Sequence, residues 1–74
     1  IDFQLPQRSD VELVVFNTLG QKVRTLVNET VSAGTHSVVW DGKNEAGQGV
    51  ASGIYLYRFE TKDYQKIQKM ILMK

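Results

Sequence analysis

The chain has 74 residues, of which 42% are hydrophobic, and its formal net charge is +1. This length fits one small domain, and the hydrophobic content is normal for a globular chain and too high for a disordered one. The nine Lys and Arg residues are scattered, which argues against a nucleic-acid-binding surface, and the absence of cysteine excludes disulfides and thiolate metal sites.

Alternation of apolar and polar residues predicts about seven short β-strands and no helix. In chain order, their expected spans are residues 1–5, 11–16, 22–27, 35–40, 48–51, 54–60 and 64–73. Residues 11–16 are apolar on both faces, which is typical of a central strand. Short strands separated by turn signals favour a sandwich of two antiparallel sheets.

Glycines mark several of the predicted turns. Residues 17–20 predict a hairpin in which Gly20 takes a positive φ, and Gly34 and Gly53 occupy similar positions at strand ends. We expect these three glycines to have a backbone role. A tight turn is expected at Lys62 and Asp63.

Bulky side chains recur at every second position in two strands that flank a Gly-rich loop. They are His36, Val38 and Trp40 before the loop, and Tyr55, Tyr57 and Phe59 after it. We expect Trp40 to be buried between the sheets as the anchor of the core, and Tyr55 and Tyr57 to lie in the core. A sugar-stacking aromatic platform is the alternative.

No set of residues predicts catalysis or metal binding. His36 is the only histidine, and it lacks a partner for a zinc site or for a nucleophile, so we expect it to shield a strand edge beside Trp40. Asp41, Asn44 and Glu45 would suit a calcium loop, but Lys43 falls at a required ligand position. We therefore expect Asp41 and Asn44 to stabilise turns, and we expect no enzyme activity, no cofactor and no metal site.

The last segment of the chain is apolar on two faces. Met70 and Leu72 alternate with Ile67, Ile71 and Met73, and we assign the second set to the outer face. One interpretation is a covered strand, and the other is an exposed strip that a partner recognises. The candidate recognition residues are Lys69, Met70, Ile71, Leu72, Met73 and Lys74.

The motifs resemble a known family when they are taken in order along the chain. They are I-x-F-x-L-P, V-x-L-x-V-F-N-x-L-G-Q, A-G-x-H-x-V-x-W-D-G, S-G-I-Y-x-Y-R and K-M-I-L-x-K. Together they resemble the C-terminal sorting domain of the type IX secretion system (the Por secretion tail), which is similar to the Ig-like domain of the flagellar hook-capping protein. The resemblance covers essentially the whole of residues 1–74 and implies an all-β, Ig-like antiparallel sandwich.

The resemblance also implies a function. Such domains direct a secreted cargo protein across the outer membrane to the cell surface, through the outer-membrane secretion machinery and in many members a sortase. We expect a monomeric, non-catalytic protein–protein interaction module that passes through the periplasm and has no nucleic-acid or small-molecule ligand. Because the Asn-Pro-rich segment that usually opens the family is missing, we expect residues 1–74 to be one domain cut from a larger secreted protein. A structural or assembly module and a carbohydrate-binding module of a secreted hydrolase are the alternatives.

Overall fold

The computed structural model describes residues 1–73, which form β-strands, turns and loops. Its strands are β1 (Asp2–Leu5), β2 (Ser9–Phe16), β3 (Lys22–Val31), β4 (Gly34–Ser37), β5 (Gly53–Glu60) and β6 (Gln65–Leu72). β1 and β4 form a 2-stranded sheet, and the others form a 4-stranded sheet in the order β3-β2-β5-β6. All strand pairs are antiparallel. The predicted all-β sandwich of two antiparallel sheets is therefore confirmed, with six strands in this range instead of seven.

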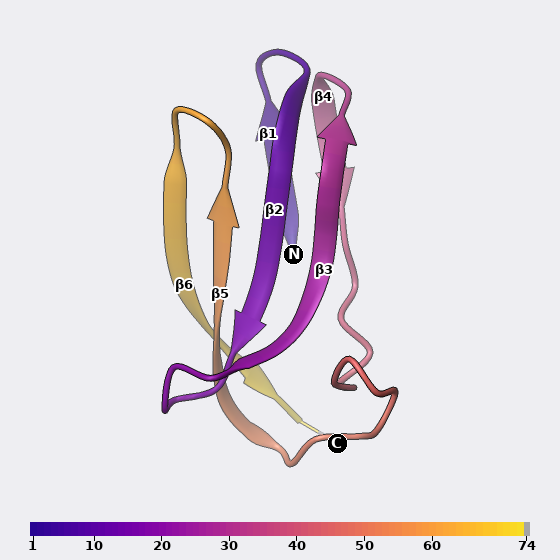
Figure 1. The fold of residues 1–74 in the computed structure, drawn as a ribbon, viewed down its shortest axis with the longest axis vertical. Helices are drawn as coiled ribbons and strands as arrows, with labels where there is room; N and C mark the ends of the chain where they lie inside the picture. Colours follow the sequence, from indigo (N-terminus) through magenta and orange to yellow (C-terminus); the bar gives the residue numbers. More distant parts are fainter. Residues whose placement is uncertain (74) are drawn as a thin grey trace.

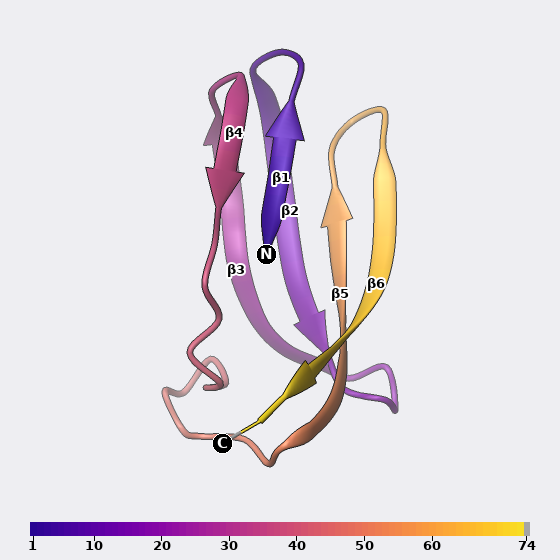
Figure 2. The ribbon, with the colours of Figure 1, turned by 180° about the vertical axis from the view of Figure 1, so that it is seen from behind.

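The small sheet covers only half of the large one. In Figure 2 β1 and β4 lie in front of β2 and β3, and in Figure 1 they lie behind them, whereas β5 and the first part of β6 lie to the side with no strand across them. At the opposite end of the molecule, the long loop between β4 and β5 and the end of β6 lie close to each other. The sandwich is thus open along one side of β1.

The core lies where the two sheets overlap. Leu5 from β1, Val11 and Leu13 from β2, and Phe59 from β5 form its buried cluster. Partly buried apolar residues pack around this cluster: Ile1, Phe3, Leu26, Val27, Val31, Val38 and Tyr57. The period-two pattern explains this arrangement, because alternate residues of each strand point toward the facing sheet.

β2 is central, as its two-sided apolarity predicts, with β3 on one side and β5 on the other. Val14 points away from the core and is nevertheless only 3% exposed. Arg58 lies directly opposite it in the sheet register and donates a hydrogen bond to the Glu12 carboxylate. The Arg58 guanidinium also lies 5.3 Å from the centroid of the Phe16 ring. The Arg58 side chain, which comes from the neighbouring strand β5, therefore covers the apolar outer positions of β2.

The predicted hairpin between β2 and β3 is built around Asn17. The Asn17 side-chain oxygen accepts the N–H groups of Leu19 and Gln21, both at 3.0 Å, and the Gly20 N–H donates to the Asn17 carbonyl at 3.0 Å. Gly20 has a φ of 81°, which a residue with a Cβ adopts only with strain. Local hydrogen bonds and the positive φ of Gly20 therefore fix this turn.

Two predicted strand boundaries are wrong because long-range pairing decided them. They are the start of β2, which is Ser9 instead of residue 11, and the end of β3. β3 runs on to Val31 where a loop was expected, since Ser9 at the start of β2 pairs with Val31. The side chain of Thr30 also donates to Asp10 across the pair. A bulge between Leu13 and Val14 shifts the register of β2 against β3. The bulge explains why two consecutive residues of β3, 26 and 27, both pack on the core.

The predicted strand at residues 48–51 is also wrong. In its place the structure has one isolated bridge between Lys43 and Gly49. The predicted strand at residues 35–40 ends at Ser37; the next residue, Val38, still exchanges two hydrogen bonds with Ile1, and the chain then enters the loop. The final strand is slightly shorter than predicted and spans residues 65–72.

Candidate protein-contact face

The outer face of β5 and β6 carries the exposed apolar residues of this sheet. In the register, Ile54 lies directly opposite Ile71, and Ile67 lies opposite Arg58. The exposed fractions of Ile54, Ile67 and Ile71 are 47%, 63% and 65%. Cross-strand neighbours share one face, so these isoleucines form an exposed apolar surface, here called the isoleucine face.

A cation lies within the isoleucine face. Lys69 is opposite Leu56, between the positions of Ile67 and Ile71. Arg58, the other cation of this face, is already engaged with Glu12, at partial exposure of both side chains. The face therefore offers apolar area with one unpaired ammonium group among the described residues, and this fits an apolar partner surface with an acidic group.

The structure separates the candidate recognition residues into two faces, as the alternation predicts. Met70 and Leu72 are half-buried, whereas Lys69, Ile71 and Met73 are exposed. Lys74 lies outside the described residues. Recognition of residues 69–74 by a partner stays a prediction. Sequence reasoning missed Ile54, although the alternation of Ile54 with the buried Tyr55 was a signal that it points outward.

The prediction that Trp40 is the buried anchor of the core is wrong. Trp40 is half-buried, lies in the loop after β4 and is not part of the central cluster. Its ring packs edge-on against Tyr55 at 5.0 Å, and its Nε1–H donates to the Lys43 carbonyl at 2.9 Å. The indole therefore packs the long loop against the beginning of β5. It does not join the sheets, because β4 ends before it and the chain no longer follows β1.

Replacing Trp40 with alanine is expected to lower the free energy of unfolding by about 2 kcal/mol. The loss combines one aromatic contact, one hydrogen bond and partial burial, and is smaller than the roughly 3–5 kcal/mol of a fully buried aromatic residue. Urea unfolding followed by circular dichroism measures it. A loss as large as that of a core residue would contradict this placement.

The aromatic row of β5 is mostly enclosed. Tyr55 and Phe59 are buried and Tyr57 is half-buried. The Tyr55 hydroxyl donates to the Ala51 carbonyl at 2.6 Å, and the Tyr57 hydroxyl donates to the Gln68 side chain at 3.3 Å. Core packing of these rings explains the row, and the platform of bare aromatic rings that sugar stacking would need is not formed by Tyr55 and Phe59.

His36 has a structural position, but not the one expected. It lies opposite Phe3 in the register, and the centroids of the two rings are 5.4 Å apart; among the described residues His36 makes no ring contact with Trp40. Its Nε2–H donates to the Ser32 carbonyl at 2.8 Å. Since Nε2 carries the proton in this bond, and no carboxylate or hydroxyl is bonded to it among the described contacts, the geometry offers no catalytic pair.

The polar residues of the long loop stabilise turns, as predicted. The Asp41 carboxylate accepts the N–H of Lys43 at 3.1 Å and the Arg24 guanidinium at 3.3 Å. The Asn44 side-chain oxygen accepts the N–H groups of Ala46 and Gln48. These are Asx turns, in which a short polar side chain replaces a backbone acceptor. In residues 1–73 no group of three or more His, Cys, Asp or Glu side chains is arranged to hold a metal.

The predicted glycine geometry is confirmed at all three positions. Gly20, Gly34 and Gly53 have φ values of 81°, 123° and 151°, and Gly42 and Gly47 are positive as well. No heavy atom lies within 4 Å of the position that a Cβ would take at Gly20. Backbone conformation, and not lack of space, is therefore what requires glycine in this turn.

Comparison with known families gives a match over most of the chain. The model of the FlgD Ig-like domain matches residues 1–64. No curated protein gives a significant match. The matched range contains β1 to β5 and the turn that follows them, and it ends before β6 begins at residue 65.

Proposed function

Since this chain belongs to the FlgD Ig-like domain family, we propose that it is a non-catalytic structural module that packs against another protein of an assembly. The members of this family are structural domains. This agrees with a fold in which the aromatic rings of β5 pack in the core and the polar side chains of the long loop stabilise turns. The contact surface in this proposal is the isoleucine face.

One observation carries the choice of surface. Three isoleucines from two adjacent strands are about half exposed or more on one face of the sheet. Isolated exposed apolar residues are normal, but a contiguous apolar surface with a polar surround is typical of a protein–protein contact. Lys69 within this face supplies a charged group that would favour a partner with an acidic residue.

The experiment uses the full-length protein in the organism that encodes it. Threonine replaces Ile54, Ile67 and Ile71 together, and this triple substitution is called the isoleucine variant. Threonine is chosen because it keeps the β-branched shape and removes most of the apolar contact. We expect the variant to stay folded by circular dichroism and to co-purify with its partner at least about tenfold less efficiently, as for loss of several interface residues.

A matched control is available in Val39. It is 85% exposed, apolar and β-branched, but it lies in the loop after β4. Val39→Thr should leave co-purification unchanged. Wild-type co-purification of the folded isoleucine variant would contradict the proposed surface, and an equal loss in Val39→Thr would show that the effect is not specific to this face.

Sorting for secretion is the second candidate function. The sequence resemblance suggests it, and the observation that favours it is that β6 and the residue after it expose the apolar side chains of Ile67, Ile71 and Met73. In this version the partner would be the outer-membrane secretion machinery and the module would reach the periplasm and cell surface. The isoleucine variant separates the two candidates. Retention of a fused reporter inside the cell supports sorting, whereas normal export with loss of the assembly supports the structural role.

A further inference from the structure

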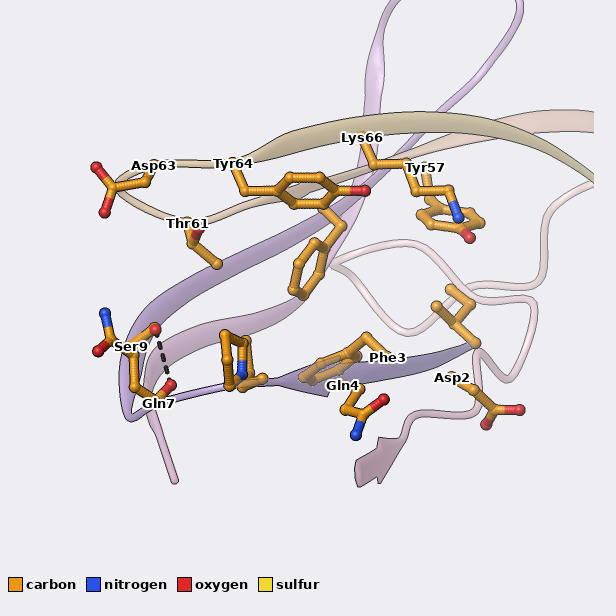
Figure 3. Close-up of a pocket in the computed structure, with 14 residues that line it drawn as sticks. Asp2, Phe3, Gln4, Gln7, Ser9, Tyr57, Thr61, Asp63, Tyr64 and Lys66 are labelled. Atoms are coloured by element: carbon orange, nitrogen blue, oxygen red, sulfur yellow. Dashed lines mark hydrogen bonds between the residues drawn. The ribbon is translucent and has the colours of Figure 1, made fainter. Parts of the chain in front are cut away.

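β1 has a strand on only one side, and its open edge borders a groove. β1 pairs with β4 alone, and in Figure 2 its other side faces β5 and β6. A groove of about 500 Å³ lies at this place. Phe3 on β1 forms one wall, and Tyr57 and Tyr64 lie on the other side (Figure 3). Phe59 on β5 also lines the groove.

The hydrogen-bond pattern of β1 shows which backbone groups face this groove. The Ile1 nitrogen donates to the Val38 carbonyl at 2.7 Å, and the Val38 N–H donates to the Ile1 carbonyl at 2.8 Å. In an antiparallel pair, residues that exchange both bonds alternate with residues whose N–H and C=O groups point to the other side. Asp2 and Gln4 are in this second set, so their backbone donors and acceptors point to the open edge.

The groove offers an added strand two kinds of contact. The free N–H and C=O groups of Asp2 and Gln4 would bond to its backbone, in the manner of strand addition to an open sheet edge. Its alternate side chains would point toward the rings of Phe59 and Tyr64, which lie 6.2 Å apart and line the groove. A strand there would bring the small sheet to three strands opposite four, which is the seven-strand count of an Ig-type sandwich.

Charge indicates which kind of strand fits. Asp2 and Asp63 lie at opposite ends of the groove in Figure 3, with their carboxylates turned outward, and Lys66 lies between them on the β6 wall. Two carboxylates at the ends favour basic residues at the ends of the occupant, while the ammonium group between them disfavours a cation at its middle. We propose that this groove binds an extended segment of a partner protein that adds to β1, with apolar residues at alternate positions and a basic residue at each end.

The test uses the 74-residue chain and a short synthetic peptide in which valine and threonine alternate between terminal lysines. Binding is measured by calorimetry, and the contact is located from amide shifts and hydrogen exchange by NMR. We expect slower exchange of the Asp2 and Gln4 amides on binding. A peptide with glutamate in place of both lysines should bind at least about threefold more weakly, because each exposed ion pair contributes modestly.

Proline variants distinguish backbone pairing at the open edge of β1 from non-specific binding of the peptide. Gln4→Pro removes an N–H that faces the groove and leaves the bonds to β4 intact, so it should weaken binding about fivefold or more, the usual effect of one lost hydrogen bond. Thr35→Pro is the matched control, because Thr35 is the register partner of Gln4 and its N–H points away from β1. It should bind the peptide like the wild type.

Three results would overturn the proposal. They are equal binding of the lysine and glutamate peptides, equal loss of binding in the two folded proline variants, and unchanged exchange of the Asp2 and Gln4 amides at saturation. A concentration-dependent dimer that protects these amides without peptide would also overturn it, since the occupant would then be a second copy of the chain. The isoleucine variant keeps the groove and should bind the peptide normally, so this test does not depend on the proposed assembly contact.

Discussion

Replacing Phe59 with alanine is expected to lower the free energy of unfolding by about 3–5 kcal/mol. Phe59 is buried on β5 and belongs to the cluster where the two sheets meet. Its ring lies 4.8 Å from that of Phe3 on the small sheet, so its removal takes away a contact between the layers as well as core volume. A chain of this length has a total stability of roughly 4–11 kcal/mol, which makes this a large fraction of it. The measurement is the urea midpoint followed by circular dichroism.

Two variants divide this loss into its parts. Phe59→Leu keeps most of the apolar volume and should cost less than about 1.5 kcal/mol. Tyr64→Ala removes the ring that contacts Phe59 from the exposed side and should cost about 1 kcal/mol or less, because Tyr64 itself is exposed. If Tyr64→Ala were as damaging as Phe59→Ala, the stabilising contact would lie at the rim of the groove and not in the core.

Replacing Leu13 with alanine is expected to cost about 2–5 kcal/mol. Leu13 is 0% exposed and lies on the central strand, opposite Phe59 on one side and Val27 on the other. The substitution would leave a cavity enclosed by two neighbouring strands and the small sheet, so the surrounding side chains have little freedom to fill it. Thermal unfolding measured by circular dichroism should show a clearly lower midpoint.

The chain contains a close control for this substitution. Leu19 is 81% exposed in the hairpin turn, so Leu19→Ala is the same chemical change without a cavity. Its expected effect is within about 0.5 kcal/mol, the usual range for surface positions. Similar midpoints for the two variants would mean that Leu13 does not occupy the enclosed position described here. A midpoint that falls only for Leu13→Ala agrees with it.

Much of the local structure was predictable from the residues themselves. The faces of β1, β2 and β5 follow from apolar residues at every second position, and the turns at Asn17 and Asp41 follow from side chains that can accept nearby N–H groups. The exposed and half-buried faces of β6 were predicted by the same rule. The rule could not predict how deeply each side chain is buried. Val38 and Trp40 are two residues apart and were predicted to lie on the same face of one strand, yet only Val38 packs on the core.

The sequence by itself determined an all-β fold, the faces of its strands and the positions of its turns, because these depend on residues that are neighbours along the chain. Only the tertiary structure decided which strands the small sheet covers, where β3 bulges and ends, and that the isoleucine face and the β1 groove are open. These features arise from pairing between segments far apart in sequence, such as Ile1 with Val38. A period of two specifies which side of a strand is apolar, but it carries no information about whether another strand will lie across that side.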